Sequence, residues 1–199
     1  MPFRASLGSA FMAESDVGEG IRPRVVIVGG APATGKTTLA TQVAQALQLP
    51  LLAKDLIKES LLDSFAAADL AASQKVGAAG WELLFLVAAW LLDARVGFVI
   101  EGNFEARAAD RLRRIARRSH AVQVICQCSD KLSQERYERR AAAADRHLGH
   151  MDIARIQRGQ RPVSDFGPFD LGVPTLIVDT TSDYHPTLTE ILAFIRGDN

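Results

Sequence analysis

The sequence predicts an α/β fold in which a parallel sheet is covered by helices on both faces. Strand-like and helix-like segments alternate along the chain, and most of the strand-like runs are continuously apolar. Such runs are typical of strands that are buried on both faces, as in a parallel sheet. The alternation is typical of open α/β folds, whose ligands bind at the carboxyl ends of the strands.

The elements can be placed in order along the chain. Strands are expected at 24–29, 51–53, 97–100, 121–127 and 175–178. Helices are expected at about 36–48, 54–65, 74–94, 106–118, 130–144 and 186–196. Residues 145–174 read as an excursion of loop and helix. Residues 1–22 are rich in glycine, serine and charge, and we expect a flexible extension before a single domain of residues 23–199.

The composition does not predict an overall electrostatic attraction to nucleic acid or to anionic membranes. The 199 residues include 23 basic and 23 acidic side chains, a formal net charge of +0. The most apolar stretch, from Val76 to Leu92, carries Glu82, so we expect a buried core helix, not a membrane span. Cys126 and Cys128 lack nearby partners with metal-ligand spacing and are read as structural. A reducing cytoplasm fits this chain.

One motif predicts a phosphate site. It fits the phosphate-loop (Walker A) spacing G-x-x-x-x-G-K-[ST] with a further threonine, and its residues are Gly30, Ala31, Pro32, Ala33, Thr34, Gly35, Lys36, Thr37 and Thr38. A strand-like run precedes it and a helix-like stretch follows, so backbone N–H groups and the helix dipole converge on one anion site. We expect Lys36 to reach the β- and γ-phosphates of a nucleotide and Thr37 to hold Mg²⁺.

Two charged side chains follow the second strand-like segment. Asp55 lies at the end of the sheet that faces the phosphate site, where a carboxylate can accept the proton of an attacking hydroxyl. The alternative is a helix N-cap, because aspartate is favoured there. Lys58, one turn further on, is a candidate for holding an anionic or polar part of the acceptor. The alternative for Lys58 is a solvated lysine.

The third strand-like segment ends on an acid. Glu101 can hold Mg²⁺ through water or bind the hydroxyls of an acceptor. Its alternative is a strand-end charge that points to solvent. Asn103 is a candidate for the same pocket. Two aromatic residues, Trp81 and Phe85, together with Phe65, hint at a partly apolar acceptor, although a core role explains them equally well.

The helix-like segment after the fourth strand carries three arginines. Arg136, Arg139 and Arg140 are spaced to share one helical face, although interleaved glutamates leave a salt-bridged surface as the alternative. The functional interpretation is a lid over about 136–160 whose arginines close over the transferring phosphate.

Three further features are less specific. His147 and His150 either touch nucleotide or acceptor at the tip of this lid or belong to a polar loop. Thr180, after the last strand, is a candidate for shaping a pocket for the nucleotide base. A helix-like segment carries six arginines, and we favour an exposed, charge-balanced helix over a nucleic-acid surface. These arginines are Arg107, Arg111, Arg113, Arg114, Arg117 and Arg118.

Taken together, these motifs resemble the small P-loop kinases, in particular the branch that includes chloramphenicol phosphotransferase, zeta-toxin-like kinases and polynucleotide 5′-kinases. The resemblance extends from about residue 25 to the C-terminal helix. It rests on residues 30–38, 53–58, 101–103 and 178–181 and on the pair Arg136 and Arg140.

The resemblance implies a P-loop NTPase three-layer fold, with a five-stranded parallel sheet and a mobile lid, that uses ATP and Mg²⁺. It implies that Asp55 is the catalytic base, that Arg136 and Arg140 are lid arginines, and that Lys58 stands where polynucleotide kinases bind the acceptor's phosphate through arginine. The sequence departs from the family pattern at Ala33, where many relatives have glycine, and at Glu101, where aspartate is usual.

Three functions are weighed. The leading hypothesis is an ATP-dependent kinase that phosphorylates a hydroxyl of a small molecule such as a metabolite, sugar, nucleoside or antibiotic. The second is a polynucleotide 5′-hydroxyl kinase, which only the arginine-rich segment and Lys58 support. The third is a nucleotide-dependent switch or binding module that has no acceptor and no need for Asp55. No membrane partner is expected.

Overall fold

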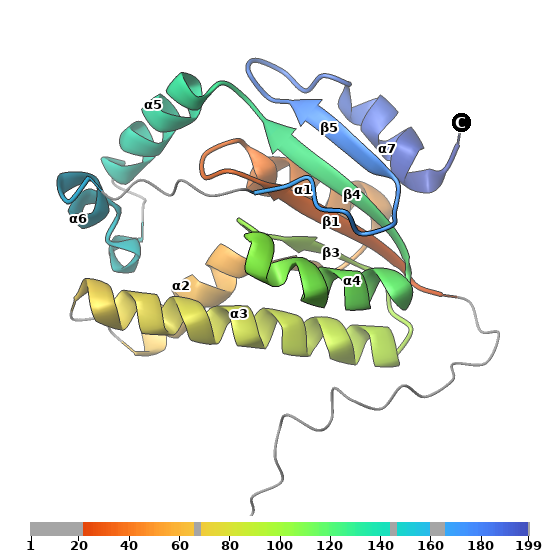
Figure 1. Cartoon of the computed structure of the whole chain (residues 1–199), viewed down its shortest axis with the longest axis horizontal. Coiled ribbons are helices and arrows are strands. Elements are labelled where there is room, and N and C mark those ends of the chain that lie inside the picture. Colours follow the sequence, from red (N-terminus) through yellow and green to blue (C-terminus); the bar gives the residue numbers. More distant parts are fainter. Residues whose placement is uncertain (1–21, 66–68, 144–146, 160–165, 199) are drawn as a thin grey trace, which may run out of the picture.

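Five parallel strands form one sheet in the order β2-β3-β1-β4-β5 (Figure 1). The computed structural model describes residues 22–65, 69–143, 147–159 and 166–198, so the expected N-terminal extension lies outside it apart from residue 22. The strands are β1 (Arg24–Gly30), β2 (Leu51–Ala53), β3 (Phe98–Glu101), β4 (His120–Gln127) and β5 (Thr175–Asp179). All five predicted strands are confirmed, and Glu101 ends β3 as expected.

The helices also follow the predicted order. They are α1 (Lys36–Leu47), α2 (Lys54–Ser64), α3 (Leu70–Asp93), α4 (Ala109–Arg117), α5 (Asp130–Ala141), α6 (Asp152–Gln157) and α7 (Leu188–Arg196), with 3₁₀ turns η1 (Ala106–Ala108) and η2 (Leu148–His150). α3 begins four residues before the predicted start, because the Asp69 side chain caps it by accepting the Ala72 N–H at 2.7 Å. The predicted helix at 106–118 is divided into η1 and α4.

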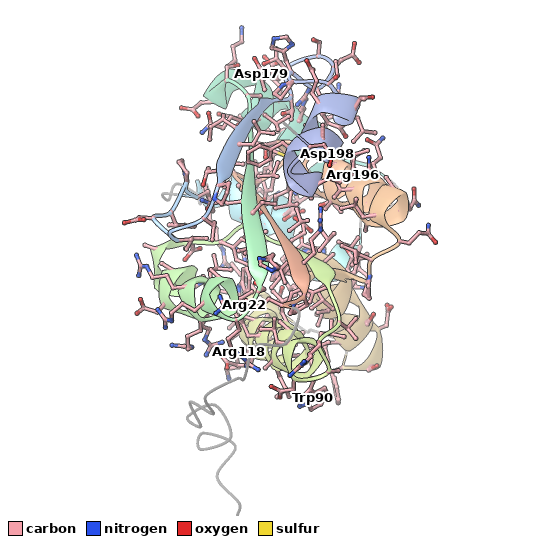
Figure 2. The ribbon with its side chains drawn as sticks, turned by 90° about the vertical axis from the view of Figure 1, so that its right-hand side faces the viewer. Arg22, Trp90, Arg118, Asp179, Arg196 and Asp198 are labelled. Carbon is pink, nitrogen blue, oxygen red and sulfur yellow. The ribbon has the colours of Figure 1, made fainter. Side chains whose placement is uncertain are left out.

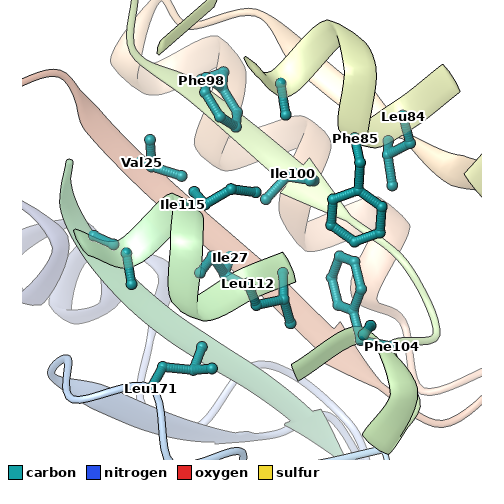
Figure 3. Packing of buried hydrophobic residues seen from close by; sticks show 14 of the residues in the cluster. Val25, Ile27, Leu84, Phe85, Phe98, Ile100, Phe104, Leu112, Ile115 and Leu171 are labelled. Carbon is teal, nitrogen blue, oxygen red and sulfur yellow. The ribbon is translucent and has the colours of Figure 1, made fainter. Parts of the chain in front are cut away.

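One face of the sheet packs against α3 and α4. Val25 and Ile27 of β1 point to this face and meet Leu84 and Phe85 of α3 and Leu112 of α4 (Figure 3). All five side chains are buried. Burial of each such side chain stabilises the fold by roughly 1.5–3 kcal/mol relative to exposure. This layer therefore fixes the helices that line the cavity described below.

The opposite face packs against α1 and α7. Val26 and Val28 alternate with the residues of the first face and contact Leu39 and Val43 of α1 and Ile191 of α7. Because successive side chains of a strand point to opposite faces, a continuously apolar β1 serves both cores. The three-layer architecture expected from the sequence is confirmed.

α3 is the one described helix that is long and apolar enough to cross a membrane by length and composition. In this fold its inner side packs in the core through Gly80, Leu84, Ala88 and Leu92. The expectation of a core helix is therefore met on one side of α3, whereas Trp90 on another side is 57% exposed.

The excursion after α5 returns across the carboxyl end of the sheet as η2 and α6 (Figure 1). The Tyr137 hydroxyl of α5 donates to Asp152 Oδ1 of α6 at 2.9 Å. His147 and His150 bind acids of α2, at 3.0 Å from Asp63 and 2.7 Å from Glu59. The excursion thereby bridges α5 and α2, as a lid docked on the body of the domain would.

Candidate active site

The phosphate loop lies between β1 and α1. At Gly30, φ is 140°, and an added Cβ would lie 2.4 Å from the Cys126 carbonyl oxygen, so only glycine fits. Gly35 has φ 79° and ends the loop as the N-cap of α1. Ala33, where the sequence departs from the family pattern, is left-handed at φ 63°. A residue with a Cβ pays about 1–2 kcal/mol for that conformation.

The N-terminus of α1 is open to an anion. No side chain caps the helix and no acid lies in its first turn. The first N–H groups of a helix have no intrahelical acceptor, and the helix dipole adds partial positive charge at that end. Thr34 is buried and its hydroxyl donates to the Ala31 carbonyl at 2.8 Å, which braces the loop from within. Thr37 and Thr38 are exposed at the mouth of the site.

Lys36 lies over the loop. Its Nζ donates to the Ala31 carbonyl at 3.2 Å and lies 4.0 Å from Glu101 Oε1. Burial lowers the pKa of the ammonium, while the nearby charges of Glu101 and Asp55 act in the opposite direction. A bound polyphosphate would add negative charge beside this buried cation and favour its protonated form.

Glu101 and Thr37 fit a magnesium site. Burial raises the pKa of the Glu101 carboxyl, whereas Lys36 and a hydrogen bond from Thr37 act to lower it. Its Oε2 is buried without a hydrogen-bond partner among the described residues. An unpaired buried carboxylate oxygen beside a threonine hydroxyl is a fit for a hard cation that prefers oxygen ligands. Among the described residues, no group of three His, Cys, Asp or Glu side chains has an arrangement that could hold a metal ion, so phosphate and water would have to complete the coordination shell.

Asp55 lies in the first turn of α2. The N-cap of that helix is Ala53, and no side chain caps it, so the alternative role of Asp55 as the N-cap is not what the structure has. Lys54 Nζ donates to Asp55 Oδ1 at 3.0 Å. Burial raises the pKa of the Asp55 carboxyl, but Lys54, His150 and Lys36 outweigh it and hold the pKa well below its usual range. Asp55 is therefore an anion at neutral pH.

A cavity of about 610 Å³ opens beside Asp55. Its walls come from α2, α3, η1, α4, α5, η2 and α6, and the residues that carry most of its chemistry are Lys54, Asp55, Lys58, Trp81, Asn103, Arg140 and Arg155. Trp81 and Phe85 line one wall and stack at 6.1 Å between ring centroids. Phe65 does not line this cavity and is 67% exposed, which removes it from the expected acceptor pocket.

The three arginines of α5 do not act on one site. Arg136 donates from Nη1 to the Thr180 carbonyl at 2.9 Å and from Nη2 to the Thr181 carbonyl at 3.0 Å. Arg140 instead lines the cavity beside Asp55, and its charge lowers the pKa of Lys36. Arg139 is exposed. The expectation that the three arginines act together is therefore wrong. α5 contributes Arg140 to one cavity and Arg136 to another.

Arg136 borders a second cavity of about 500 Å³, which Ala33 and Gly35 of the phosphate loop also line. Thr180 also lines it, but its hydroxyl is already used. It donates to the Thr34 carbonyl at 2.8 Å and lies 3.0 Å from the Gln127 carbonyl. Thr180 thus fastens the loop after β5 to the phosphate loop, while Tyr184 and Thr38 contribute to the wall of the cavity.

Sequence reasoning missed several residues of this site. Lys54, Ser73, Tyr137 and Arg155 line the cavity, and none was singled out. Lys54 adjoins Asp55 in the sequence, so its charge next to a predicted base was a readable signal. The other three line the cavity only because α3, α5 and α6 pack around it. No local sequence pattern predicts that packing.

The arginine-rich segment is largely ion-paired. Arg111 binds Glu82 at 2.8 Å, Arg113 binds Asp110 at 2.7 Å, and these pairs are partly exposed. Arg118 binds Asp93 and Arg107 binds Glu105. The charge-balanced interpretation therefore holds for these four arginines. Burial raises the pKa of the Cys126 thiol to about 12, as befits an unreactive structural cysteine.

The fold and the phosphate loop define a P-loop kinase-like protein, and comparison with known proteins agrees. Residues 25–162 match the profile of a family described as an AAA domain. That match covers more than half of the chain, and the chain therefore belongs to this family of P-loop domains. Among curated proteins, no sequence match is found.

Solved structures extend the comparison. A candidate kinase from Chloroflexus aurantiacus is 33% identical, with a TM-score of 0.76 over 88% of this chain and 98% of that chain. An APS kinase from Mycobacterium tuberculosis, solved with AMPPNP and APS, is 18% identical, with a TM-score of 0.60 over 89% and 99% of the two chains. A gluconokinase from Sinorhizobium meliloti is 18% identical, with a TM-score of 0.54 over 89% and 94%. The last two show the shared fold alone.

Proposed function

We propose that this protein transfers the γ-phosphate of ATP to a hydroxyl of a small molecule. The observation that carries the proposal is the position of Asp55. This partly buried, anionic carboxylate interacts electrostatically with Lys36 of the phosphate loop and lines the large cavity. A switch that only binds nucleotide needs neither the cavity nor the carboxylate. The chemistry belongs in the cytoplasm, where ATP is available.

The chain's own residues account for each part of the transfer. Phosphoryl transfer needs positioning and charge neutralisation more than covalent chemistry. The loop N–H groups and Lys36 bind the phosphates, while Arg140 neutralises charge on the transferring group. Asp55 orients the acceptor hydroxyl and accepts its proton. Mg²⁺ held by Thr37 and Glu101 supplies further charge neutralisation when it is bound.

The second cavity supports a site for the nucleotide base. It adjoins the phosphate loop, shares no lining residue with the cavity beside Asp55, and is lined by Arg136 and Tyr184. A guanidinium plane and an aromatic ring are suitable partners for the flat face of a base. The base and the acceptor would then occupy separate cavities that both adjoin the phosphate loop.

The test is transfer of labelled γ-phosphate from ATP–Mg²⁺ to a panel of nucleosides, sugars, antibiotics and 5′-hydroxyl oligonucleotides. We expect label to move to a small molecule with wild-type protein and to be strongly reduced with Asp55→Asn. Transfer only to oligonucleotides, with a steep dependence on salt, would instead support a polynucleotide kinase. Slow ATP hydrolysis that Asp55→Asn leaves unchanged would contradict the proposal and favour the switch.

A further inference from the structure

Lys58 is a buried cation that faces the acceptor cavity. Its side chain is 4% exposed, and Nζ donates to Ser73 Oγ at 2.9 Å. The Ser73 hydroxyl in turn donates to the Gly149 carbonyl at 2.6 Å, so the serine is held to accept from the ammonium. Within the described ranges, no carboxylate forms an ion pair with Lys58. An ammonium carries three donors, and this contact uses one.

The uncompensated charge is costly to bury. Taking a cation out of water without an anionic partner disfavours its charged form. Burial, together with the neighbouring cations Lys54 and Arg155, accordingly lowers the pKa of Lys58 to about 8, although Asp55 and Asp152 act in the opposite direction. A bound anion would relieve this cost, because it would supply the missing partner.

Arg155 of α6 adds a second unpaired cation to the same cavity. Its guanidinium has no ion pair or side-chain hydrogen bond with any residue that the structure describes. Most of the other cations of the cavity are matched, since Lys54 binds Asp55, Arg107 binds Glu105 and Arg111 binds Glu82. Arg140 acts near Lys36 and belongs with the transferring phosphate. The excess positive charge of the acceptor end therefore lies at Lys58 and Arg155.

We propose that the acceptor carries an anionic group, a carboxylate, phosphate or sulfate, and that Lys58 and Arg155 bind it. The inference rests on the proposed kinase function. Asp55 and Lys58 lie three residues apart on α2, on one helical face with Cβ atoms about 5–6 Å apart. The phosphorylated hydroxyl would therefore be only a few bonds from the anion, as in a hydroxy acid or a sugar phosphate.

In the proposed reaction, one bond to the γ-phosphorus forms as another breaks. The hydroxyl oxygen of the acceptor forms a bond to the γ-phosphorus as the bond from that phosphorus to the β–γ bridging oxygen breaks. ADP leaves with those electrons, and the hydroxyl proton passes to Asp55 and then to solvent. Lys58 and Arg155 take no part in bond making. They fix the acceptor so that its hydroxyl meets Asp55.

Matched acceptors test the inference: glycerol against glycerate and glycerol 3-phosphate, and glucose against gluconate and glucose 6-phosphate. We expect at least a tenfold higher kcat/KM for the anionic members. Lys58→Met should raise the acceptor KM at least tenfold without changing the KM for ATP, and Lys58→Arg should restore part of it. Lys131→Met, an exposed lysine of α5, is the control. Equal or better use of neutral members, unaffected by Lys58→Met, would overturn the inference and leave the kinase function standing.

A binding measurement covers the case in which no panel member is phosphorylated. The phosphate loop is first filled with AMPPNP–Mg²⁺, and inorganic sulfate is then titrated while the unfolding temperature is followed. We expect sulfate to stabilise wild type and Lys131→Met but not Lys58→Met. That result would support the anion site even if the kinase proposal failed. The same response in Lys58→Met would overturn the anion site.

A separate observation concerns the outer side of α3. A continuous apolar stripe follows it at spacings of three and four residues, through Ala72, Val76, Ala79, Leu83, Leu86, Val87 and Trp90. Leu83 and Trp90 are 36% and 57% exposed. Figure 2 shows Trp90 at the outer edge of the molecule, on the side of α3 that faces away from the sheet. This spacing is that of helices that pack in pairs.

The charges beside the stripe fit a second copy of the same helix. Lys75 and Asp93 lie eighteen residues, or about five turns, apart, and therefore flank the stripe on the same edge. In an antiparallel pair related by a two-fold axis through Leu83, Val76 meets the partner's Trp90, and Lys75 lies near the partner's Asp93. Asp93 is largely exposed while it binds Arg118 of its own chain through Oδ1.

We infer that two copies of this chain associate through α3, antiparallel and centred on Leu83. Analytical ultracentrifugation should give twice the chain mass of 21.6 kDa for wild type and the single mass for Leu83→Glu, with unchanged circular dichroism. Lys75→Glu should weaken the dimer, and adding Asp93→Lys should restore it. Leu56→Glu, 52% exposed on α2, is the control. A monomeric wild type, or one that binds lipid vesicles through this stripe instead, would overturn the inference.

Discussion

The two sides of the active site are built in different ways. The nucleotide side is made by one continuous segment, Gly30 to Thr38, which leaves the N-terminal N–H groups of α1 open to phosphate. The acceptor side is made by single side chains from five α-helices, two 3₁₀ turns and the loops between them. A site made by backbone N–H groups depends on the loop conformation more than on the identity of single side chains. A side-chain site can change its substrate one residue at a time, so the two sides should respond differently to mutation.

The largest effect is expected on the nucleotide side. Lys36→Ala removes the buried cation that we propose binds the phosphates, so transfer should fall by about 10³-fold or more with every acceptor. Labelled transfer and binding of AMPPNP measure this effect. Lys131→Ala serves as the control for loss of a lysine. Retention of nucleotide affinity and turnover in Lys36→Ala would show that the phosphate loop does not work as described.

Asp55→Asn should act on the chemistry and not on the nucleotide. Loss of a general base typically lowers turnover by about 10²–10⁴-fold. We expect the low end of that range, because the lowered pKa makes Asp55 a weak base that mainly orients the hydroxyl. The same lowered pKa keeps Asp55 charged as pH falls from 7 to 5, so it should not cause an acid loss of activity there. A fall in kcat centred within that range would contradict this assignment.

Glu101→Gln should raise the Mg²⁺ concentration that gives half-maximal activity, by about 10–100-fold. The substitution keeps the shape of the side chain and removes the charge that the metal would neutralise. Titration of MgCl₂ at saturating ATP measures the effect, and the apparent metal affinity of wild type should fall as pH is lowered, because the raised pKa favours the protonated acid. An unchanged Mg²⁺ requirement in Glu101→Gln would remove it from the metal site.

On the acceptor side, a change of pH should have a smaller effect, which is confined to the affinity for an anionic acceptor. The pKa of Lys58 is lowered to about 8, so its charge is present below that pH and is lost as pH rises through it. The affinity for an anionic acceptor should therefore fall about tenfold by pH 9, and Lys58→Arg should abolish this loss. The described charged or titratable groups that face Lys58 or share its cavity are Lys54, Asp55, Glu82, Glu105, Arg107, Arg111, Tyr137, Arg140, His150, Asp152 and Arg155. A decline that persists in Lys58→Arg would assign it to one of those groups or to another step.

The smallest effect is expected at Ala33. Its left-handed backbone is a cost that glycine would relieve, but glycine also gains entropy in the unfolded chain. Ala33→Gly should therefore change the free energy of unfolding by no more than about 1 kcal/mol and leave ATP affinity unchanged. Chemical denaturation and AMPPNP titration measure both. A tenfold loss of ATP affinity would mean that the Cβ of Ala33 shapes the loop.

The same contrast explains what the sequence predicted. The strands, the helices and the phosphate loop follow from local patterns, and Glu101 was found because parallel strands end at one edge. Arg136 and Arg140 were expected to act at one site. In the structure Arg136 donates to the Thr180 carbonyl, whereas Arg140 lines the cavity beside Asp55. Ser73 and Arg155 had no local signal, because only the packing of α3 and α6 around the cavity gives them a role.

The most direct test of this account is one pair of measurements on Asp55→Asn, namely AMPPNP–Mg²⁺ affinity by calorimetry and labelled γ-phosphate transfer to the acceptor panel. The account predicts an affinity within about twofold of wild type together with turnover lower by at least about 10²-fold. Loss of affinity and turnover together would contradict the separation of the two sides. Turnover close to wild type with a true acceptor would contradict the role of Asp55 in the reaction.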